Sequence, residues 1–175
     1  MPEPALKLLF PRAEIENQIG RLAAEISRDY RDQEILAVGV LKGSFLFFAD
    51  LVRAITTPLV IDFVRLASYG SETRSSGIVE IRYDLETSLR GRDVLIVEDI
   101  IDSGNTLEVF YHRLLLRQPR SVRICTLIDK RGRREVNLQA DYVGLTMEEG
   151  FIVGYGLDHD ERYRNLPDIY LLEGI

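Results

Sequence analysis

The chain has 175 residues, a net charge of −6, and 46% hydrophobic and 29% charged residues. These values are typical of a folded globular protein and not of a disordered one. The acidic balance disfavours nonspecific binding to nucleic acid, because that function needs a basic surface. The longest apolar runs, such as residues 35–41, are too short to span a membrane. We therefore expect one domain, residues 1–175, that binds neither a membrane nor nucleic acid.

The single cysteine, Cys125, lies in a strand-like apolar run and has no second cysteine with which to form an intrachain disulfide. We interpret it as a buried thiol in a reducing compartment. The N-terminal residues also lack the basic segment and long apolar stretch of a secretory signal. Together these features predict a cytoplasmic protein.

The first half of the chain alternates between helical and strand patterns. Residues 11–31 carry apolar side chains at three- and four-residue steps, which predicts an amphipathic helix with Pro11 in its first turn. Residues 34–41 form a continuous apolar run, typical of a parallel strand covered on both faces. A second helical pattern follows at 45–55, and residues 58–67 predict another strand.

The segment 68–77 is polar and contains two glycines and four serines. It is too long for a tight turn. From the residues alone it could be an idle loop or a lid that closes over a site. Residues 78–85 then alternate as an antiparallel strand does.

The second half repeats the strand–helix order. Residues 94–97 predict a buried strand, and a helical pattern follows Thr106 and ends before Pro119. Residues 121–130 predict another buried strand, after which the pattern changes to short strands and loops. This order predicts an α/β fold, with a mostly parallel twisted sheet flanked by helices.

The stretch 94–107, VLIVEDIIDSGNTL, concentrates the chemistry. We expect a loop that carries Glu98, Asp99 and Asp102 at the carboxyl end of a strand, where open α/β sheets bind ligands. A helix that begins near Gly104 would direct its unpaired N–H groups into this loop. With nearby hydroxyl groups, those N–H groups make a cradle for a phosphate. Glu98 and Asp99 would repel a phosphate, but they suit ribose hydroxyls or Mg²⁺. The pattern therefore predicts a ribose 5-phosphate site.

This stretch resembles the phosphoribosyl-pyrophosphate (PRPP) motif of the type I phosphoribosyltransferases. Further segments are similar to those of the hypoxanthine (guanine) phosphoribosyltransferases, in the same order along the whole chain: LKGS at 41–44, SYGS at 68–71, LIDK at 127–130, FIVGYGLD at 151–158 and RYRNLP at 162–167. The resemblance implies transfer of the 5-phosphoribosyl group from PRPP to N9 of hypoxanthine or guanine in purine salvage, with Mg²⁺ as cofactor. It also implies a fold with a core at about 30–145 and a hood formed by the N-terminal segment and about 146–175.

The resemblance assigns roles to the central acidic stretch. Glu98 and Asp99 contact the ribose hydroxyls and the metal, and Asp102 lies where the family has its proposed general base for purine N7. The 5-phosphate site is implied to consist of Asp102, Ser103, Gly104, Asn105 and Thr106.

The other segments are implied to hold the remaining parts of the substrates. Pyrophosphate is held by Leu41, Lys42 and Gly43, through an unusual cis peptide, and by Arg164. The purine segment supplies Lys130 for the exocyclic oxygen, Phe151 for stacking, Ile152 for backbone contacts, and Asp158, which also helps to hold a second Mg²⁺. The mobile lid of the family corresponds to Ser68 and Tyr69.

Two positions depart from the family pattern next to the base site: Gly150 stands where relatives carry a larger side chain, and KRGRR at 130–134 differs from the usual continuation. A xanthine-preferring transferase is therefore an alternative. An adenine-preferring enzyme is disfavoured because the amino group of adenine opposes the donor of Lys130. A PRPP-sensing regulator of nucleic acid is a more distant alternative. The resemblance also implies a homodimer or homotetramer.

Overall fold

The computed structural model describes residues 5–68 and 79–174. Its larger sheet has six strands, which are parallel except for the antiparallel edge strand β4. Across the sheet the order is β4 (Val79–Tyr83), β3 (Leu59–Ser68), β2 (Ile35–Leu41), β5 (Asp93–Ile101), β6 (Ser121–Lys130) and β7 (Tyr142–Met147). The predicted α/β class and the antiparallel strand after residue 78 are confirmed.

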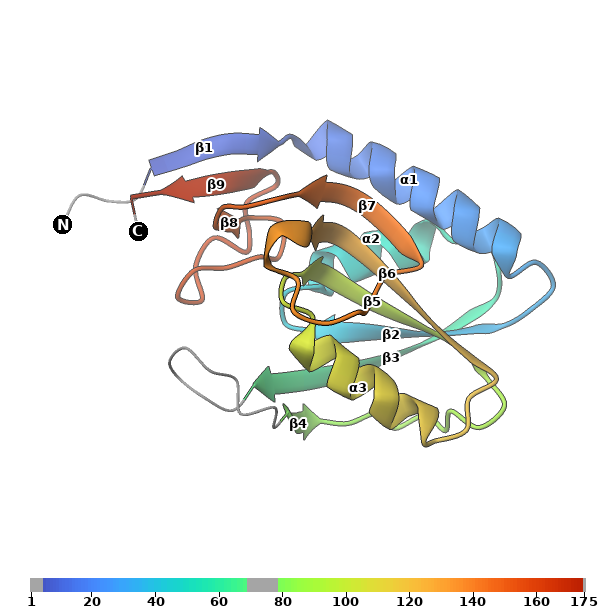
Figure 1. Ribbon diagram of the computed structural model, residues 1–175. Helices are drawn as coiled ribbons and strands as arrows, with labels where there is room; N and C mark the ends of the chain where they lie inside the picture. The colour runs from blue at the N-terminus through green and yellow to red at the C-terminus, as the bar shows by residue number, and fades with distance from the viewer. Residues whose placement is uncertain (1–4, 69–78, 175) are drawn as a thin grey trace.

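Helices cover both faces of this sheet (Figure 1). Helices α1 (Arg12–Asp29) and α2 (Phe45–Ala54) pack together on one face, and α3 (Asn105–Leu115) covers the other. A short 3₁₀ helix, η1 (Arg131–Arg133), follows β6. Helix α1 begins at Arg12 with Pro11 as its N-cap, so the proline lies one position before the first turn in which we had expected it.

A smaller antiparallel sheet joins the two ends of the chain. Its order is β1 (Ala5–Phe10), β9 (Ile169–Glu173) and β8 (Ile152–Val153). In Figure 1 it lies beyond the end of the large sheet toward which the parallel strands point. The expected hood of terminal segments is therefore present, and it stands over the carboxyl ends of the parallel strands.

The central strand β5 shows why the sheet needs helices on both faces. Leu95 and Val97 belong to the apolar cluster beneath α1 and α2, whereas Val94 and Ile96 belong to the cluster beneath α3. All four side chains are completely buried. Burial of each stabilises the fold by about 1.5–3 kcal/mol, so this short run helps to position the acidic residues that follow it.

Strand β5 is longer than its apolar run predicted. It continues to Ile101, because Ile100 and Ile101 pair with Ile128 and Asp129 of β6. Glu98 and Asp99 therefore belong to the strand, and the expectation that they lie in a loop is wrong. This placement gives the two carboxylates a rigid backbone.

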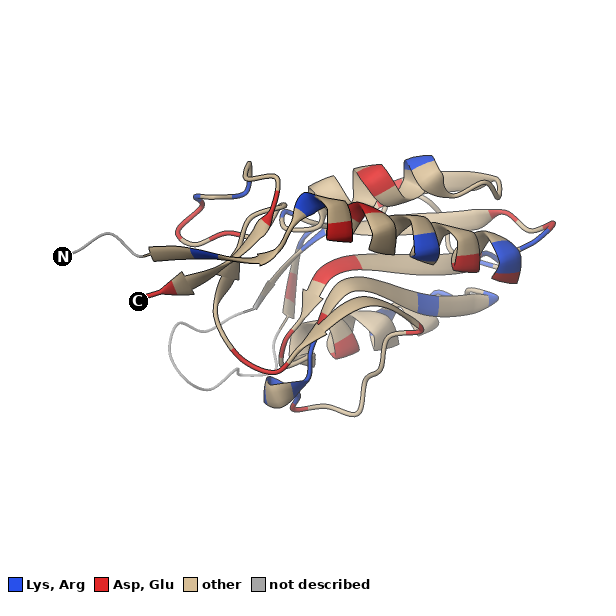
Figure 2. Cartoon of the chain, turned by 90° about the horizontal axis from the view of Figure 1, so that it is seen from above, with Lys and Arg blue, Asp and Glu red and all other residues tan. Residues whose placement is uncertain are grey.

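Charged side chains are distributed over the outer surface. Acidic and basic residues are interspersed along α1 (Figure 2), with Arg12–Glu16 and Arg21–Glu25 paired one turn apart. Such exposed pairs each contribute less than about 1 kcal/mol. Among the residues that the structure describes, no helix is long and apolar enough to cross a membrane.

Candidate active site

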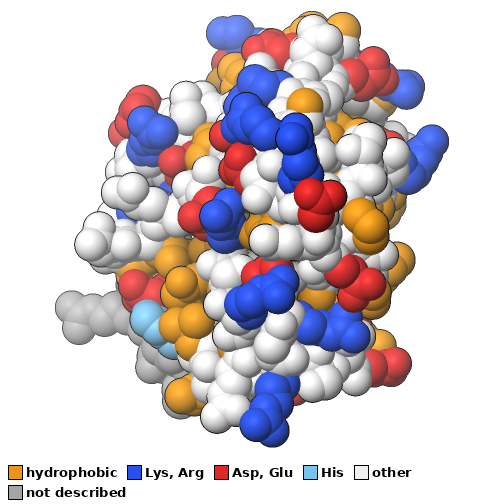
Figure 3. All heavy atoms as spheres, turned by 90° about the vertical axis from the view of Figure 1, so that its right-hand side faces the viewer, with side chains coloured by type: hydrophobic (Ala, Val, Ile, Leu, Met, Phe, Trp, Pro, Cys, Tyr) orange, Lys and Arg blue, Asp and Glu red, His pale blue; other side chains and the backbone are white. Residues whose placement is uncertain are grey.

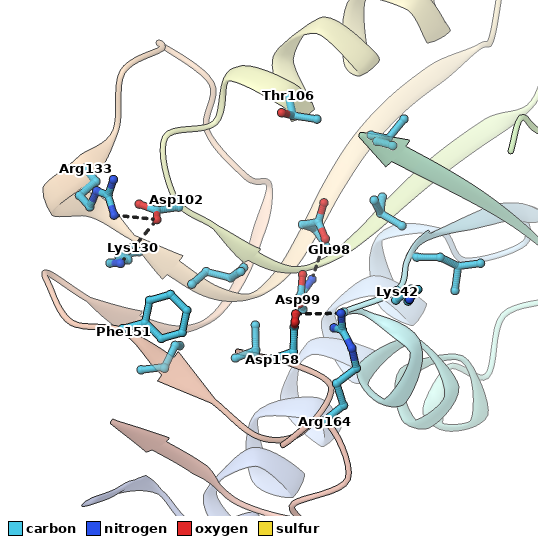
Figure 4. Close-up of a pocket in the computed structure, with 17 residues that line it drawn as sticks. Lys42, Glu98, Asp99, Asp102, Thr106, Lys130, Arg133, Phe151, Asp158 and Arg164 are labelled. Atoms are coloured by element: carbon cyan, nitrogen blue, oxygen red, sulfur yellow. Dashed lines mark hydrogen bonds and ion pairs between the residues drawn. The ribbon is translucent and has the colours of Figure 1, made fainter. Parts of the chain in front are cut away.

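A cavity of about 440 Å³ opens between the carboxyl ends of the parallel strands and the segments around the hood (Figure 4). It brings together most of the residues predicted to form the site, which come from five separate segments of the chain: Leu41, Lys42, Gly43, Glu98, Asp99, Asp102, Thr106, Lys130, Phe151, Ile152, Asp158 and Arg164. Because residues so distant in sequence meet at one cavity, their clustering supports the prediction that they form one site.

The remaining predicted residues have other positions. Ser103 and Gly104 line an adjoining cavity of about 160 Å³, which Glu98, Asp102 and Thr106 also line. Ser68 is the last residue of β3. Tyr69 and the rest of the predicted lid lie outside the described residues.

The turn after β2 approaches the acidic pair closely. The peptide bond between Leu41 and Lys42 is cis, as the family resemblance implied for this segment. A Cβ atom at Gly43 would lie 1.9 Å from Asp99 Oδ2. Only glycine therefore allows this backbone to approach the carboxylate, and the loop can reach the end of β5.

Glu98 and Asp99 are adjacent carboxylates in a poorly solvated place. Asp99 is buried and Glu98 is half-buried, and the Asp99 N–H donates to Glu98 Oε1 (3.2 Å). Burial raises the pKa of Glu98 well above its usual value, and the negative charge of Asp99 adds to the effect. Burial also raises the pKa of Asp99. A cation or hydroxyl donors would relieve this cost, because they stabilise the ionised form.

The loop before α3 has the form of an anion cradle. Gly104 precedes the helix with φ +85°, and a Cβ atom there would lie 2.7 Å from Val136 Cγ2. The first helical N–H groups are directed into the loop, where they and the dipole of α3 favour an anion. Asn105 is turned away from the cavity, since its side-chain amide donates to Glu135 Oε2 (2.5 Å). Its backbone N–H donates to Ser103 Oγ (3.4 Å).

Asp102 lies beside two cations on one side of the cavity (Figure 4). Its Oδ2 lies 3.5 Å from Lys130 Nζ and 3.6 Å from Arg133 Nη1. Its Oδ1 is buried and has no hydrogen-bond partner among the described residues. A buried acceptor without a partner is costly to the fold and is often found at functional sites. Asp102 therefore has an oxygen available to a ligand.

The backbone of Asp102 is held by Arg134. The Arg134 guanidinium donates to the carbonyls of Asp102 (3.1 Å) and Leu138 (2.6 Å), and it pairs with Asp129. Its side chain is only 17% exposed. Although a basic, glycine-containing segment such as 130–134 is typical of an exposed turn, Arg134 is therefore not a solvated turn residue.

Phe151 presents its ring to the cavity and is 41% exposed. His159 contacts it edge-on, with ring centroids 5.3 Å apart and an interplanar angle of 81°. Ile152, the next residue, is buried in β8. The exposed aromatic face beside buried Lys130 suits a planar heterocycle with an acceptor at its edge.

Arg164 lies in a dense set of polar contacts opposite the acidic pair. Its Nη2 pairs with Asp158 Oδ1 (2.8 Å) and with Glu161 Oε2 (3.3 Å), and its Nη1 donates to the carbonyl of Gly156 (2.8 Å). The same Glu161 oxygen accepts from Lys42 Nζ (2.9 Å). These cations hold the pKa of the Glu161 carboxyl below its usual value, with Lys42 the larger cause.

No group of three or more Asp, Glu, His or Cys residues within residues 5–68 and 79–174 is arranged to hold a metal ion by itself. Glu98, Asp99 and Asp158 thus do not form a closed three-ligand site. Magnesium commonly binds proteins through one or two carboxylates and completes its coordination with water and substrate phosphate. The buried acidic pair fits that mode.

Other lining residues were not predicted from the sequence. Arg133 belongs to the basic cluster that starts at Lys130, and the position of that cluster directly after a predicted strand was a usable signal. Leu157 lies within the predicted purine segment at 151–158, but no role was predicted for it. The apolar lining residues Val40, Leu66 and Ile100 look like ordinary core positions and offer no signal.

Comparisons with known proteins agree with this geometry. The family model "Phosphoribosyl transferase domain" matches residues 9–160. The chain is 48% identical over 167 residues to a hypoxanthine-guanine phosphoribosyltransferase of Bacillus subtilis, covering 95% of this chain and 93% of that protein. It is 47% identical over 164 residues to a hypoxanthine phosphoribosyltransferase of Salmonella typhimurium, covering 93% and 92%. The crystal structure of a hypoxanthine phosphoribosyltransferase from Staphylococcus aureus superimposes with a TM-score of 0.93 at 42% identity, covering 95% of this chain and 91% of that one.

Proposed function

Since the chain belongs to the hypoxanthine/guanine phosphoribosyltransferases of purine salvage, we propose that its cavity transfers the 5-phosphoribosyl group of PRPP to N9 of the purine. The products are the purine nucleotide and pyrophosphate. The observation that carries the proposal is the position of Asp102. It is shared between the cavity that holds Lys130 and Phe151 and the smaller cavity at the start of α3. A ribose 5-phosphate and a base can therefore meet at this residue.

The phosphoribosyl group binds along the end of β5. The 5-phosphate accepts hydrogen bonds from residues 103–106, and the left-handed Gly104 and the amino end of α3 support this assignment. Glu98 and Asp99 accept hydrogen bonds from the ribose hydroxyls. Those bonds favour the ionised carboxylates, whose burial otherwise raises their pKa.

The family generally uses PRPP together with magnesium. Glu98 and Asp99 would hold the metal near the ribose, and Asp158 would help to hold a second ion near the pyrophosphate. The raised pKa of the buried acidic pair supports this assignment, because a cation offsets the repulsion between the two carboxylates. When bound, the metal neutralises part of the charge on the pyrophosphate.

Lys42 and Arg164 hold the leaving group together with the backbone at Leu41 and Gly43. Departure of pyrophosphate from C1 builds an oxocarbenium-like centre, as in glycoside hydrolysis. The two cations stabilise the charge that grows on pyrophosphate at that moment. Both residues line the cavity, which supports this assignment.

The base stacks on Phe151, and the backbone at Ile152 contacts its edge. Lys130 donates to the 6-oxo group of the purine. The Lys130 side chain is only 6% exposed, so little water competes with the purine oxygen for its ammonium group. The carboxylate of Asp102 accepts the N7 proton as N9 attacks C1, a contribution of about 10²–10⁴-fold to the rate. The predicted lid residues Ser68 and Tyr69 exclude water from the reacting centre.

We further propose that the enzyme acts in the cytoplasm as a homodimer or homotetramer. Burial raises the pKa of the Cys125 thiol, which supports the interpretation of a buried, unreactive cysteine. Sedimentation of the purified chain measures its oligomeric state, and a monomer at assay concentration contradicts that part of the proposal.

A purine panel tests the function. Hypoxanthine, guanine, xanthine and adenine are each incubated with PRPP and Mg²⁺, and the nucleotide formed is measured. We expect turnover with hypoxanthine, guanine or both, and little with adenine. A clear preference for xanthine would instead support the alternative base assignment, and no nucleotide with any base would refute the function.

A further inference from the structure

One acidic side chain occupies the place at which the proposed pyrophosphate cations meet. Glu161 Oε2 accepts from Lys42 Nζ at 2.9 Å and lies 3.3 Å from Arg164 Nη2. A single carboxylate oxygen therefore bridges the two cations, although Lys42 and Glu161 are 119 residues apart in the chain. A phosphate oxygen that bound both cations would need the same position.

The backbone of the loop that carries Glu161 is conformationally constrained. Asp160 and Glu161 have φ values of +50° and +61°, and Tyr163 has +75°. Non-glycine residues adopt this region at a cost in strain, and they persist in it only where the surroundings impose it. The Glu161 N–H also donates to Asp158 Oδ2 (2.9 Å). The backbone is thus held in place beside the cavity.

The side chain itself is free to leave. It is 63% exposed, and the Lys42 side chain that it contacts is 44% exposed. Ion pairs of such exposure are weak and are screened by salt. A multiply charged phosphate ligand can therefore displace the carboxylate without rearranging the loop backbone.

A second, independent observation indicates that the guanidinium of Arg164 binds a ligand. Its Nε is buried and has no hydrogen-bond partner among the described residues, whereas its Nη1 and Nη2 are bonded to Gly156 and to Asp158 and Glu161. A buried donor without a partner is costly unless a ligand satisfies it. The contacts from Glu161 thus leave the arginine incompletely satisfied.

We propose that Glu161 is a positioning residue that stands in for a pyrophosphate oxygen before substrate binds. It holds Lys42 and Arg164 side by side, and it competes with the pyrophosphate group for them. The competition weakens binding of PRPP and of pyrophosphate alike and promotes release of pyrophosphate after the transfer. This inference rests on the proposed function, because it requires that the two cations bind the leaving group.

The test compares Glu161→Gln with Asp160→Asn. The second substitution removes the same charge one residue away, and the Asp160 side chain is 87% exposed and pairs only with His159 at 3.8 Å among the described residues. For each variant the KM for PRPP and the inhibition constant of pyrophosphate are measured at saturating hypoxanthine, together with kcat.

For Glu161→Gln we expect both the KM for PRPP and the inhibition constant of pyrophosphate to fall by about two- to fivefold, the range for an exposed ion pair. Asp160→Asn is expected to leave both close to the wild-type values. Unchanged or higher values for Glu161→Gln overturn the inference, and so does an equal fall in Asp160→Asn, which would indicate only a general loss of negative charge. Wild-type enzyme that forms no nucleotide in the same assay would refute the proposed function instead.

Glu161→Asp provides a second variant with the charge retained on a shorter side chain. It cannot reach both cations as well, so we expect values between those of the wild type and Glu161→Gln. A Glu161→Asp enzyme that loses kcat with a raised KM would indicate that the residue only supports the loop, and would also overturn the inference.

Discussion

The two ends of strand β5 treat acidic side chains in opposite ways. At the amino end, buried Asp93 accepts from Arg120 Nε (3.0 Å) and Ser121 Oγ (2.7 Å), and the bond from Arg120 is the main cause that lowers its pKa. At the other end, burial raises the pKa of both Glu98 and Asp99. The same strand thus carries one carboxylate whose ionised form the fold stabilises and two whose ionised form it disfavours.

The charged groups around the two ends of the strand show the same division. Figure 3 looks at the amino end of the sheet, where acidic and basic side chains lie beside one another over the surface. At the carboxyl end, Asp102 Oδ1 and Arg164 Nε are buried without partners among the described residues. Tyr30 Oη is also buried without a partner among these residues, so a missing partner indicates a binding site only where charged groups cluster, as they do around the cavity.

Removal of divalent metal should have the largest effect. If the acidic pair of β5 needs a cation, excess EDTA lowers nucleotide formation by about a thousandfold or more, because metal stabilisation of a leaving group contributes several kcal/mol. Added Mg²⁺ should restore the rate. Full activity in EDTA would show that the pair has another role.

Asp102→Asn should lower kcat by about 10²–10⁴-fold, since an amide cannot accept the purine proton. Binding of PRPP should change little, because the backbone of residue 102 is held by Arg134 and not by its own carboxylate. Steady-state kinetics with hypoxanthine separates the two effects. A variant with wild-type turnover would remove Asp102 from the proton transfer.

Lys130→Ala should reduce kcat/KM for hypoxanthine by about 10–100-fold, the value of a hydrogen bond from a charged donor. Discrimination against adenine should weaken at the same time, because the substituted side chain no longer opposes the amino group. The purine panel checks both results. An unchanged profile of bases would place Lys130 outside base recognition.

Asp93→Asn tests the amino end of β5, where the carboxylate has hydrogen-bond partners within the fold. It should lower the free energy of unfolding by about 1–2 kcal/mol, a modest loss because the Arg120 side chain is 57% exposed. Since folding lowers the pKa of Asp93, its contribution is present above the unfolded value near about 3.9 and is lost as the pH falls through the folded value. Denaturant titrations at neutral and acidic pH measure this, and turnover at neutral pH should stay close to that of the wild type.

Much of the fold could be predicted because its apolar runs follow the physics of buried parallel strands. The run at 94–97 was recognised, but the length of β5 was not, since Glu98 and Asp99 interrupt the pattern while the backbone pairing to β6 continues. Glu161 carried no signal at all. Its role depends on a contact with Lys42 across 119 residues, which no local pattern contains. Arg134 was missed for the same reason, because its buried contacts are formed only in the folded chain.

The two ends of β5 are compared most directly by the free energy of unfolding of two variants, Glu98→Gln and Asp93→Asn. Both are measured in EDTA at neutral pH. Folding raises the pKa of Glu98, so the ionised carboxylate destabilises the folded state increasingly as the pH rises above the unfolded value near about 4.3. The neutral amide removes this cost. We predict that Glu98→Gln raises the free energy of unfolding by about 0.5–2 kcal/mol, although its activity is lost. A decrease equal to that of Asp93→Asn would contradict the account, because both ends of β5 would then serve stability.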